Sequence, residues 1–138
     1  MKKNENYYKS KKQNKLVDQR ARAAFPEYFE DLSKMARTNG GTVAKECRGR
    51  GTAKLSMEVY EAYAADVLGC TSIASVAVAP ETMHVCERRG YKVLATAYYD
   101  EEGEDFVVSM EDMQKKAETF AKFRGERPCV KFMLKELK

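Results

Sequence analysis

Residues 45–60, KECRGRGTAKLSMEVY, decide the fold, because a basic, glycine-rich turn runs directly into a helical pattern. Residues 48–51 (RGRG) alternate arginine with glycine, and Leu55 and Val59 then begin an apolar series with four-residue spacing. Glycine lets a backbone turn tightly and approach a ligand closely, and the first turn of a helix presents N–H groups that favour phosphate. The stretch therefore predicts an anion-binding turn, with a basic nucleic-acid loop and an ordinary flexible turn as alternatives. It matches neither Gly-x-Gly-x-x-Gly nor the P-loop pattern.

Hydrophobic spacing on either side of this turn predicts alternating helices and strands. Phe25, Phe29, Leu32 and Met35 recur at helical spacing, and Pro26 suits a first helical turn. In chain order we expect a helix over 26–38, a strand over 42–44, a helix from 52 to Gly69, a strand over 71–79, a helix over 80–89, strands over 91–99 and 106–108, a helix over 110–123 and a strand over 129–137. The helix from residue 52 would carry Leu55, Val59, Tyr63 and Val67 on one face. The last strand is expected to be half exposed, because Val130, Phe132 and Leu134 alternate with lysines. This order predicts an α/β or α+β fold with a mixed sheet.

The basic residues are concentrated at the N-terminus. Residues 1–24 hold eight Lys or Arg against Glu5 and Asp18, a net charge of +6, so that the other 114 residues carry −2. The segment is poorly periodic, and we expect it to be a flexible tail or a frayed helix in front of a single domain over 25–138. Its lysines and tyrosines suit a minor contact with nucleic acid, against the alternative of a solvated leader.

The cysteines and the hydropathy indicate the compartment. Cys47, Cys70, Cys86 and Cys129 are scattered without metal-ligand spacing, and His84 is the only histidine, so no metal site is expected. No apolar run approaches the roughly 20 residues that a membrane helix needs, and the N-terminal lysines are not followed by the apolar segment of a secretory signal. We therefore expect free thiols in a reducing cytoplasm and no membrane contact.

From residue 43 onward the ordered motifs resemble the second half of a GNAT-type (GCN5-related) N-acetyltransferase. Residues 48–53 (RGRGTA) match the family's cofactor loop, Arg/Gln-x-x-Gly-x-Gly/Ala, position by position. A helix, a strand and a short helix then follow, and residues 88–91 (RRGY) stand in place of the family's Lys-x-Gly-Phe. The stretch 98–104 (YYDEEGE) and the closing strand are most similar to the branch that acetylates arylalkylamines and polyamine-like small amines. The resemblance covers about two-thirds of the chain.

The resemblance implies an α/β acyltransferase core that uses acetyl-CoA as co-substrate and transfers the acetyl group directly to a small amine. It implies that the backbone of residues 48–53 cradles the pyrophosphate and that the pantetheine arm lies between residues 42–45 and 72–79. The residues implied to bind the cofactor are Val43, Arg48, Gly49, Arg50, Gly51, Thr52 and Ala53.

The catalytic groups depart from the family pattern. Cys86 occupies the position of the family's usual tyrosine acid; a thiol can donate a proton, but core packing is the alternative. Thr82 falls where the arylalkylamine branch has a hydroxyl, with helix capping as its alternative. His84 and Glu46 are candidate bases, and a surface or packing role is the alternative for the histidine.

The part of the sequence before the cofactor loop is short for the family. A complete GNAT domain places about three strands and two helices before that loop, whereas only about 42 residues precede it here. The resemblance therefore implies a core that is truncated on its N-terminal side and leaves a sheet edge open. The helix expected over 26–38 could cover part of this edge, or a second copy of the chain could cover it as a homodimer. Three interpretations stay open: an active acetyltransferase, a catalytically impaired GNAT-derived binding protein that uses its basic segment for nucleic acid or another partner, and a piece of a longer enzyme.

Overall fold

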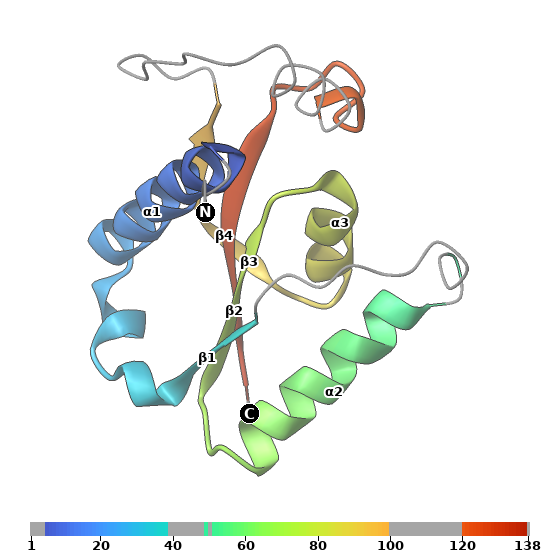
Figure 1. Cartoon of the computed structure of the whole chain (residues 1–138). Coiled ribbons are helices and arrows are strands. Elements are labelled where there is room, and N and C mark those ends of the chain that lie inside the picture. The colour runs from blue at the N-terminus through green and yellow to red at the C-terminus, as the bar shows by residue number, and fades with distance from the viewer. Residues whose placement is uncertain (1–4, 39–48, 50, 100–119, 138) are drawn as a thin grey trace.

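The computed structural model describes residues 5–38, 49, 51–99 and 120–137, with side chains from residue 13 onward. Three helices surround one sheet, with α1 on one face and α2 and α3 on the other (Figure 1). In chain order the elements are helix α1 (Glu5–Ala24), two 3-10 turns η1 (Pro26–Phe29) and η2 (Leu32–Lys34), strand β1 (Met35–Thr38), helix α2 (Thr52–Asp66), strand β2 (Ser72–Ala77), helix α3 (Pro80–Arg88), strand β3 (Lys92–Tyr98) and strand β4 (Cys129–Glu136). The expected mixed α/β architecture is confirmed.

The four strands form one mixed sheet in the order β1-β2-β4-β3. β1 runs parallel to β2, and β4 runs antiparallel to both β2 and β3, with a register shift between Val93 and Ala95. The last strand in the sequence is therefore inserted between two earlier ones. The prediction that it is half exposed is wrong, because Phe132, Met133 and Leu134 are all fully buried. A central strand with helices on both faces reads as a continuous apolar run and not as an alternation.

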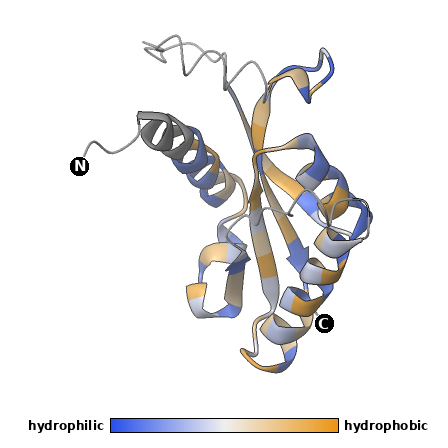
Figure 2. Ribbon diagram, turned by 45° about the vertical axis from the view of Figure 1, so that its right-hand side comes forward, coloured by the Kyte–Doolittle hydropathy of each residue, from blue (hydrophilic) through white to orange (hydrophobic). Residues whose placement is uncertain are grey.

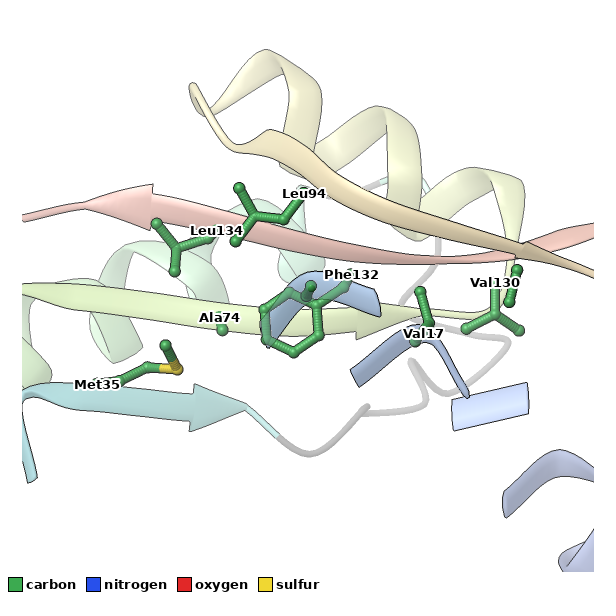
Figure 3. Close-up of a cluster of buried hydrophobic side chains, with 9 residues drawn as sticks. Val17, Met35, Ala74, Leu94, Val130, Phe132 and Leu134 are labelled. Carbon is green, nitrogen blue, oxygen red and sulfur yellow. The ribbon is translucent and has the colours of Figure 1, made fainter. Parts of the chain in front are cut away.

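The first core lies between α1 and the sheet. Val17 and Ala21 of α1 are fully buried, and they pack in one cluster with Phe132, Leu94 and Met35 of the strands (Figure 3). Burying a side chain of the size of valine or phenylalanine stabilises the fold by roughly 1.5–3 kcal/mol. The expectation of a flexible tail over residues 1–24 is therefore wrong for its described side chains, residues 13–24. The physical reason is that α1 gains its stability from the sheet and not from its own sequence pattern.

The segment after α1 differs from the helix predicted over 26–38. It forms the turns η1 and η2 and then the strand β1, in which Met35 is buried. The Asp31 side chain accepts a hydrogen bond from the Ser33 backbone N–H at 3.0 Å, a local turn that competes with a continuing helix. The carbonyl of Lys34 then accepts from the backbone N–H of Thr71 at 2.8 Å, which holds the chain beside the start of β2.

The second core lies between the sheet and the helices α2 and α3. It contains Met83 and Cys86 of α3 with Ile73 and Met133 of the strands, and Met57 of α2 packs against it. Pro80 begins α3, and Gly90, with φ +89°, follows its end. The predicted elements over 71–79, 80–89, 91–99 and 129–137 are confirmed as β2, α3, β3 and β4. The strands predicted over 42–44 and 106–108, and the helix predicted from 110 as far as residue 119, lie outside the described residues.

Among the helices that the structure describes, none has an apolar stretch long enough to cross a bilayer. Cys70, Cys86 and Cys129 are buried free thiols, as expected, and Cys47 lies outside the described residues. The side chains of His, Cys, Asp and Glu in the described ranges form no group of three that could hold a metal ion.

Candidate functional site

Two glycines before α2 adopt a backbone conformation that favours glycine. Gly49 has φ +79° and Gly51 has φ +73°, both in the left-handed region. A Cβ added to either residue would meet no described atom within 4 Å, so the backbone conformation and not crowding requires glycine there. The tight turn predicted from the sequence is thus present at its two described positions. Val43, Glu46, Arg48 and Arg50 lie outside the described residues.

The N-terminal end of α2 suits an anion. Gly51 is the N-cap residue, no side chain in the described part of the chain caps the helix, and no acidic residue lies in its first turn. The first backbone hydrogen bond of α2 runs from the Leu55 N–H to the Gly51 carbonyl at 2.9 Å. The backbone of the first turn, which includes Ala53, therefore lies at the positive end of the helix dipole. Phosphate is the ligand that such an end favours.

The parallel strands β1 and β2 pair over only part of their length. Their register runs from Met35 opposite Ser72 to Thr38 opposite Ser75. β2 continues to Ala77, and in the described ranges its last two residues pair only with β4. The pantetheine arm was expected between residues 72–79 and residues 42–45. The first segment includes this continuation of β2, and the second lies outside the described residues.

Thr82 and His84 lie on α3, which packs against β2. Thr82 is half buried in the first turn of the helix. Thr82 is not the capping residue of α3, because Ala79 occupies the N-cap position. His84 is exposed, with 71 % of its side chain accessible, and its Nδ1 lies 4.0 Å from Oε2 of Glu87. Of the two side chains, that of Thr82 is therefore the less exposed.

Cys86 lies one turn further along α3 and is fully buried. Burial raises the pKa of its thiol to about 11, and the charges of Glu61 and Glu87 act in the same direction, while a hydrogen bond with Ser75 opposes them. Burial likewise raises the pKa of the nearby Tyr91 phenol, again with Glu61 as the charge beside it. Both groups therefore stay protonated at neutral pH. The thiol packs in the second core, which is the alternative role that its position in the sequence allowed.

A buried ion cluster that was not predicted from the sequence fixes α2 to the rest of the fold. The Glu61 side chain, 8 % exposed, accepts hydrogen bonds from Arg89 Nε at 2.7 Å and Arg89 Nη2 at 3.1 Å, and also from Lys135 Nζ. Burial by itself raises the pKa of Glu61, but the hydrogen bonds from Arg89 and Lys135 outweigh it and lower the pKa. Arg89 also reaches Glu58 at 3.2 Å. One feature of the sequence could have indicated this cluster. Glu61 lies four residues after Met57 and three before Ala64, and therefore on the same side of α2 as these two apolar residues.

An open pocket of about 300 Å³ lies between α2 and the strands β1 and β2. Its walls are mainly apolar and aromatic, and two tyrosines of α2 stand at half exposure beside it. Its lining includes Ala36, Thr38, Tyr60, Tyr63, Leu68 and Ile73.

Comparison with solved structures identifies the architecture. One similar structure is that of an insect protein from the yellow fever mosquito Aedes aegypti, designated arylalkylamine N-acetyltransferase 7. It superposes on all of this chain with a TM-score of 0.67 and 17 % identity. The chain has the GNAT fold. Arylalkylamine N-acetyltransferase 2 of Aedes aegypti matches 96 % of the chain with a TM-score of 0.52 and 22 % identity. The spermidine/spermine N-acetyltransferase of Vibrio cholerae matches 76 % with a TM-score of 0.50 and 18 % identity.

The GNAT fold is shared over only part of these proteins. The chain spans 52 % of the first mosquito protein, 61 % of the second and 51 % of the bacterial one, so it corresponds to about half the length of the solved structures it resembles. No protein-family model and no curated protein matches the sequence. In this GNAT fold, α2 and α3 lie on the same face of the sheet (Figure 1), where Cys86 of α3 shares a cluster with Met57 of α2.

Proposed function

We propose that the chain is an acetyl-CoA-dependent N-acetyltransferase that transfers an acetyl group directly to a small amine. The observation that carries this proposal is the left-handed turn at Gly49 and Gly51, followed by an uncapped helix end without acidic residues, within a GNAT fold. The solved proteins with the same fold are designated arylalkylamine and spermidine acetyltransferases, which supports an amine as the acceptor.

The residues of the turn fit the pyrophosphate of acetyl-CoA. The space beside Gly49 and Gly51 is open among the described residues, so that a bulky anion can approach the backbone. Arg48 and Arg50 would add charge-assisted hydrogen bonds, Thr52 and Ala53 would offer their N–H groups, and Val43 would line the pantetheine. When bound, acetyl-CoA supplies an activated thioester whose carbonyl carbon the amine nitrogen attacks as the carbon–sulfur bond breaks.

The proton transfers are assigned to residues of this chain. The ammonium form of the acceptor has to lose a proton before it can attack, and Glu46 is the proposed base. The leaving thiolate has to gain one, and the proposed donors are the Thr82 hydroxyl and the Cys86 thiol. Thr82 is favoured over Cys86 because it is only half buried, whereas the thiol is enclosed in the core.

Thermal unfolding with and without acetyl-CoA tests the binding site. A ligand that binds only the folded state raises Tm by mass action, so we expect a rise that grows with the concentration of acetyl-CoA. Arg48→Ala should reduce this rise. Unchanged melting at millimolar acetyl-CoA would contradict the proposal.

A pair of glycine variants separates binding from strain. Gly51 and Gly69, with φ +73° and +66°, lie on either side of α2, and a Cβ at either meets no described atom within 4 Å. Gly51→Ala and Gly69→Ala should therefore each lower the free energy of unfolding by about 1 kcal/mol. Gly51→Glu should abolish the acetyl-CoA response, whereas Gly69→Glu should keep it. If both variants respond alike, the loop before α2 is not the cofactor site.

The second candidate is a catalytically impaired binding protein with this fold, and the enclosed thiol at the position of the tyrosine acid favours it. Acetylation of tryptamine, polyamines and aminoglycosides separates the two: binding of acetyl-CoA without turnover would support the impaired protein. Its contact with nucleic acid would use the basic segment, residues 1–24, in which Lys15 is exposed, Arg22 is paired with Asp18 and Arg20 donates to the Thr96 carbonyl. Salt-dependent retention on DNA tests this contact.

We also propose that the chain acts in the cytoplasm and self-associates along the open β1 edge. The three buried free thiols suit a reducing compartment. β1 lies at one end of the strand order, and an open edge of this kind is usually covered or paired.

A further inference from the structure

The outer face of α2 carries a stripe of exposed apolar side chains. Leu55, Val59, Tyr63 and Val67 are 61, 57, 54 and 65 % exposed, respectively, and they follow one another at four-residue intervals. Figure 2 shows hydrophobic residues recurring along the whole of α2, which lies at the outside of the molecule. We call these four residues the α2 stripe. A continuous apolar stripe on a surface helix marks an interaction site.

The opposite side of the same helix is also committed to packing. Met57 packs against the second core, Ala64 is buried, and Glu61 is held on the same side by Arg89 and Lys135. α2 cannot rotate to bury the stripe without breaking this cluster. A helix that is apolar on two sides is normally covered on both. In the described ranges the stripe has no place in either core, which points to a partner on this face.

The stripe is continuous with the open edge of the sheet. Tyr63 belongs to the stripe and also lines the pocket between α2 and β1, together with Ala36, Thr38 and Leu68. β1 is the terminal strand of the sheet order among the described residues, and its Ala36 and Thr38 line this pocket. A partner that covers the stripe would thus also reach the pocket and the edge of β1.

We propose that the partner is a second copy of this chain, with the two α2 helices packed antiparallel across a twofold axis. The four positions of the stripe are symmetric about position 61. An antiparallel copy therefore places Leu55 against Val67 of the second copy and Val59 against its Tyr63. Rows of side chains spaced by four residues form the ridges that interlock in the commonest class of helix packing. The stripe is self-complementary, as a twofold interface requires.

The charge on this face selects the same arrangement. Asp66 is exposed and lies about 20° around the helix from Leu55, so it is a charged residue beside the α2 stripe. In the antiparallel pair it lies near position 56 of the second copy, in the second turn of that helix, close to the end where the dipole is positive. In a parallel pair the two Asp66 carboxylates would face each other and repel. The charge therefore favours an antiparallel second copy over a parallel one.

The mass of the full chain in solution tests the proposal. Light scattering behind size exclusion, at micromolar concentration, should give twice the chain mass. Val59→Asp should weaken dimerisation about tenfold or more, because a buried aspartate in the centre of the stripe has no partner. Leu32→Asp is the matched control: Leu32 is 54 % exposed in η2 and does not belong to the α2 stripe, and this variant should remain dimeric. A monomeric wild type, or equal effects of the two variants, would overturn the proposal.

Disulfide cross-linking tests the orientation. In a Cys47→Ser background, the double variant Leu55→Cys/Val67→Cys should form a covalent dimer on mild oxidation. The two positions are about 18 Å apart along one helix, so they cannot bridge within a chain. Leu55→Cys alone should not cross-link in the antiparallel pair. Efficient cross-linking of that single variant would show a parallel pair and contradict the arrangement. Because neither experiment uses acetyl-CoA, the dimer and the proposed acetyltransferase activity can fail independently.

Discussion

Arg89 holds Glu61 through two hydrogen bonds, of 2.7 and 3.1 Å, and so joins the end of α3 to the middle of α2. Lys135 of β4 contacts the same carboxylate, which adds the central strand to the link. Elsewhere on the described α2, Met57 packs against the second core and Ala64 is buried. This cluster therefore sets the direction of α2, and with it the position of both the glycine turn at one end and the α2 stripe on its outer face.

Arg89→Ala should destabilise the fold by about 2–3 kcal/mol. The variant removes charge-assisted hydrogen bonds and leaves the Glu61 carboxylate, 8 % exposed, with only Lys135 from this cluster. Urea unfolding measures the change. Arg88→Ala is the control, since Arg88 is exposed in the preceding position and its truncation should change stability by less than about 0.5 kcal/mol. Equal effects of the two variants would mean that the Glu61–Arg89 pair does not anchor α2.

The same carboxylate predicts a dependence of stability on pH. Burial raises the pKa of Glu61, but the hydrogen bonds from Arg89 and Lys135 lower it further than burial raises it. A carboxyl whose pKa is lower in the folded state stabilises the fold above its unfolded pKa, and this contribution is lost as the pH falls through the folded pKa. The stability advantage of the wild type over Glu61→Gln should therefore be full at pH 7 and shrink below about pH 4.5.

Urea midpoints of both proteins between pH 7 and pH 3 measure this effect. The difference between them is needed, because the pKa values of Glu136 and Asp31 are also lowered by hydrogen bonds and make the wild type acid-sensitive by themselves. A difference that stays constant over this pH range would show that Glu61 is not held as a carboxylate.

Val17→Ala should cost about 2 kcal/mol, because Val17 is fully buried between α1 and the sheet and the change deletes two methyl groups. Lys15→Ala, at an exposed position on the same helix, should be nearly neutral. Chemical unfolding of both variants makes the comparison. If Val17→Ala were as mild as Lys15→Ala, residues 13–24 would behave as the flexible tail that the sequence suggested.

The sequence was most informative where the proline and glycine residues that begin or end an element agreed with the spacing of the hydrophobic residues. Pro80 and Gly90 bracket α3, and the apolar run after Gly69 is β2, so these elements were predicted to within about two residues. The glycine turn was identified because the left-handed conformation of Gly49 and Gly51 is one that few other residues adopt. These features depend on neighbouring residues alone.

The failures depend on distant residues. Val17 and Ala21 are too few to define an amphipathic helix, and they become a packing face only opposite Phe132. Met35 continues the helical spacing of Phe29, but it lies in β1 because the edge of β2 is available to pair with it. The ion cluster of α2 likewise required the position of β4, a strand some 70 residues away in sequence from Glu61. Local pattern cannot supply such contacts.

Cys86 gives the sharpest test of how the candidate site departs from its family pattern. Its thiol is fully buried, and burial, with the charges of Glu61 and Glu87, raises its pKa to about 11. Only the thiolate reacts with alkylating agents, so at pH 8 Cys86 in the folded protein should react with iodoacetamide at least a hundredfold more slowly than after denaturation. Mass spectrometry of the labelled peptides measures the rate at this residue. Rapid labelling in the folded state, if slowed by acetyl-CoA, would instead place the thiol in the cofactor site and restore it over Thr82 as the proton donor.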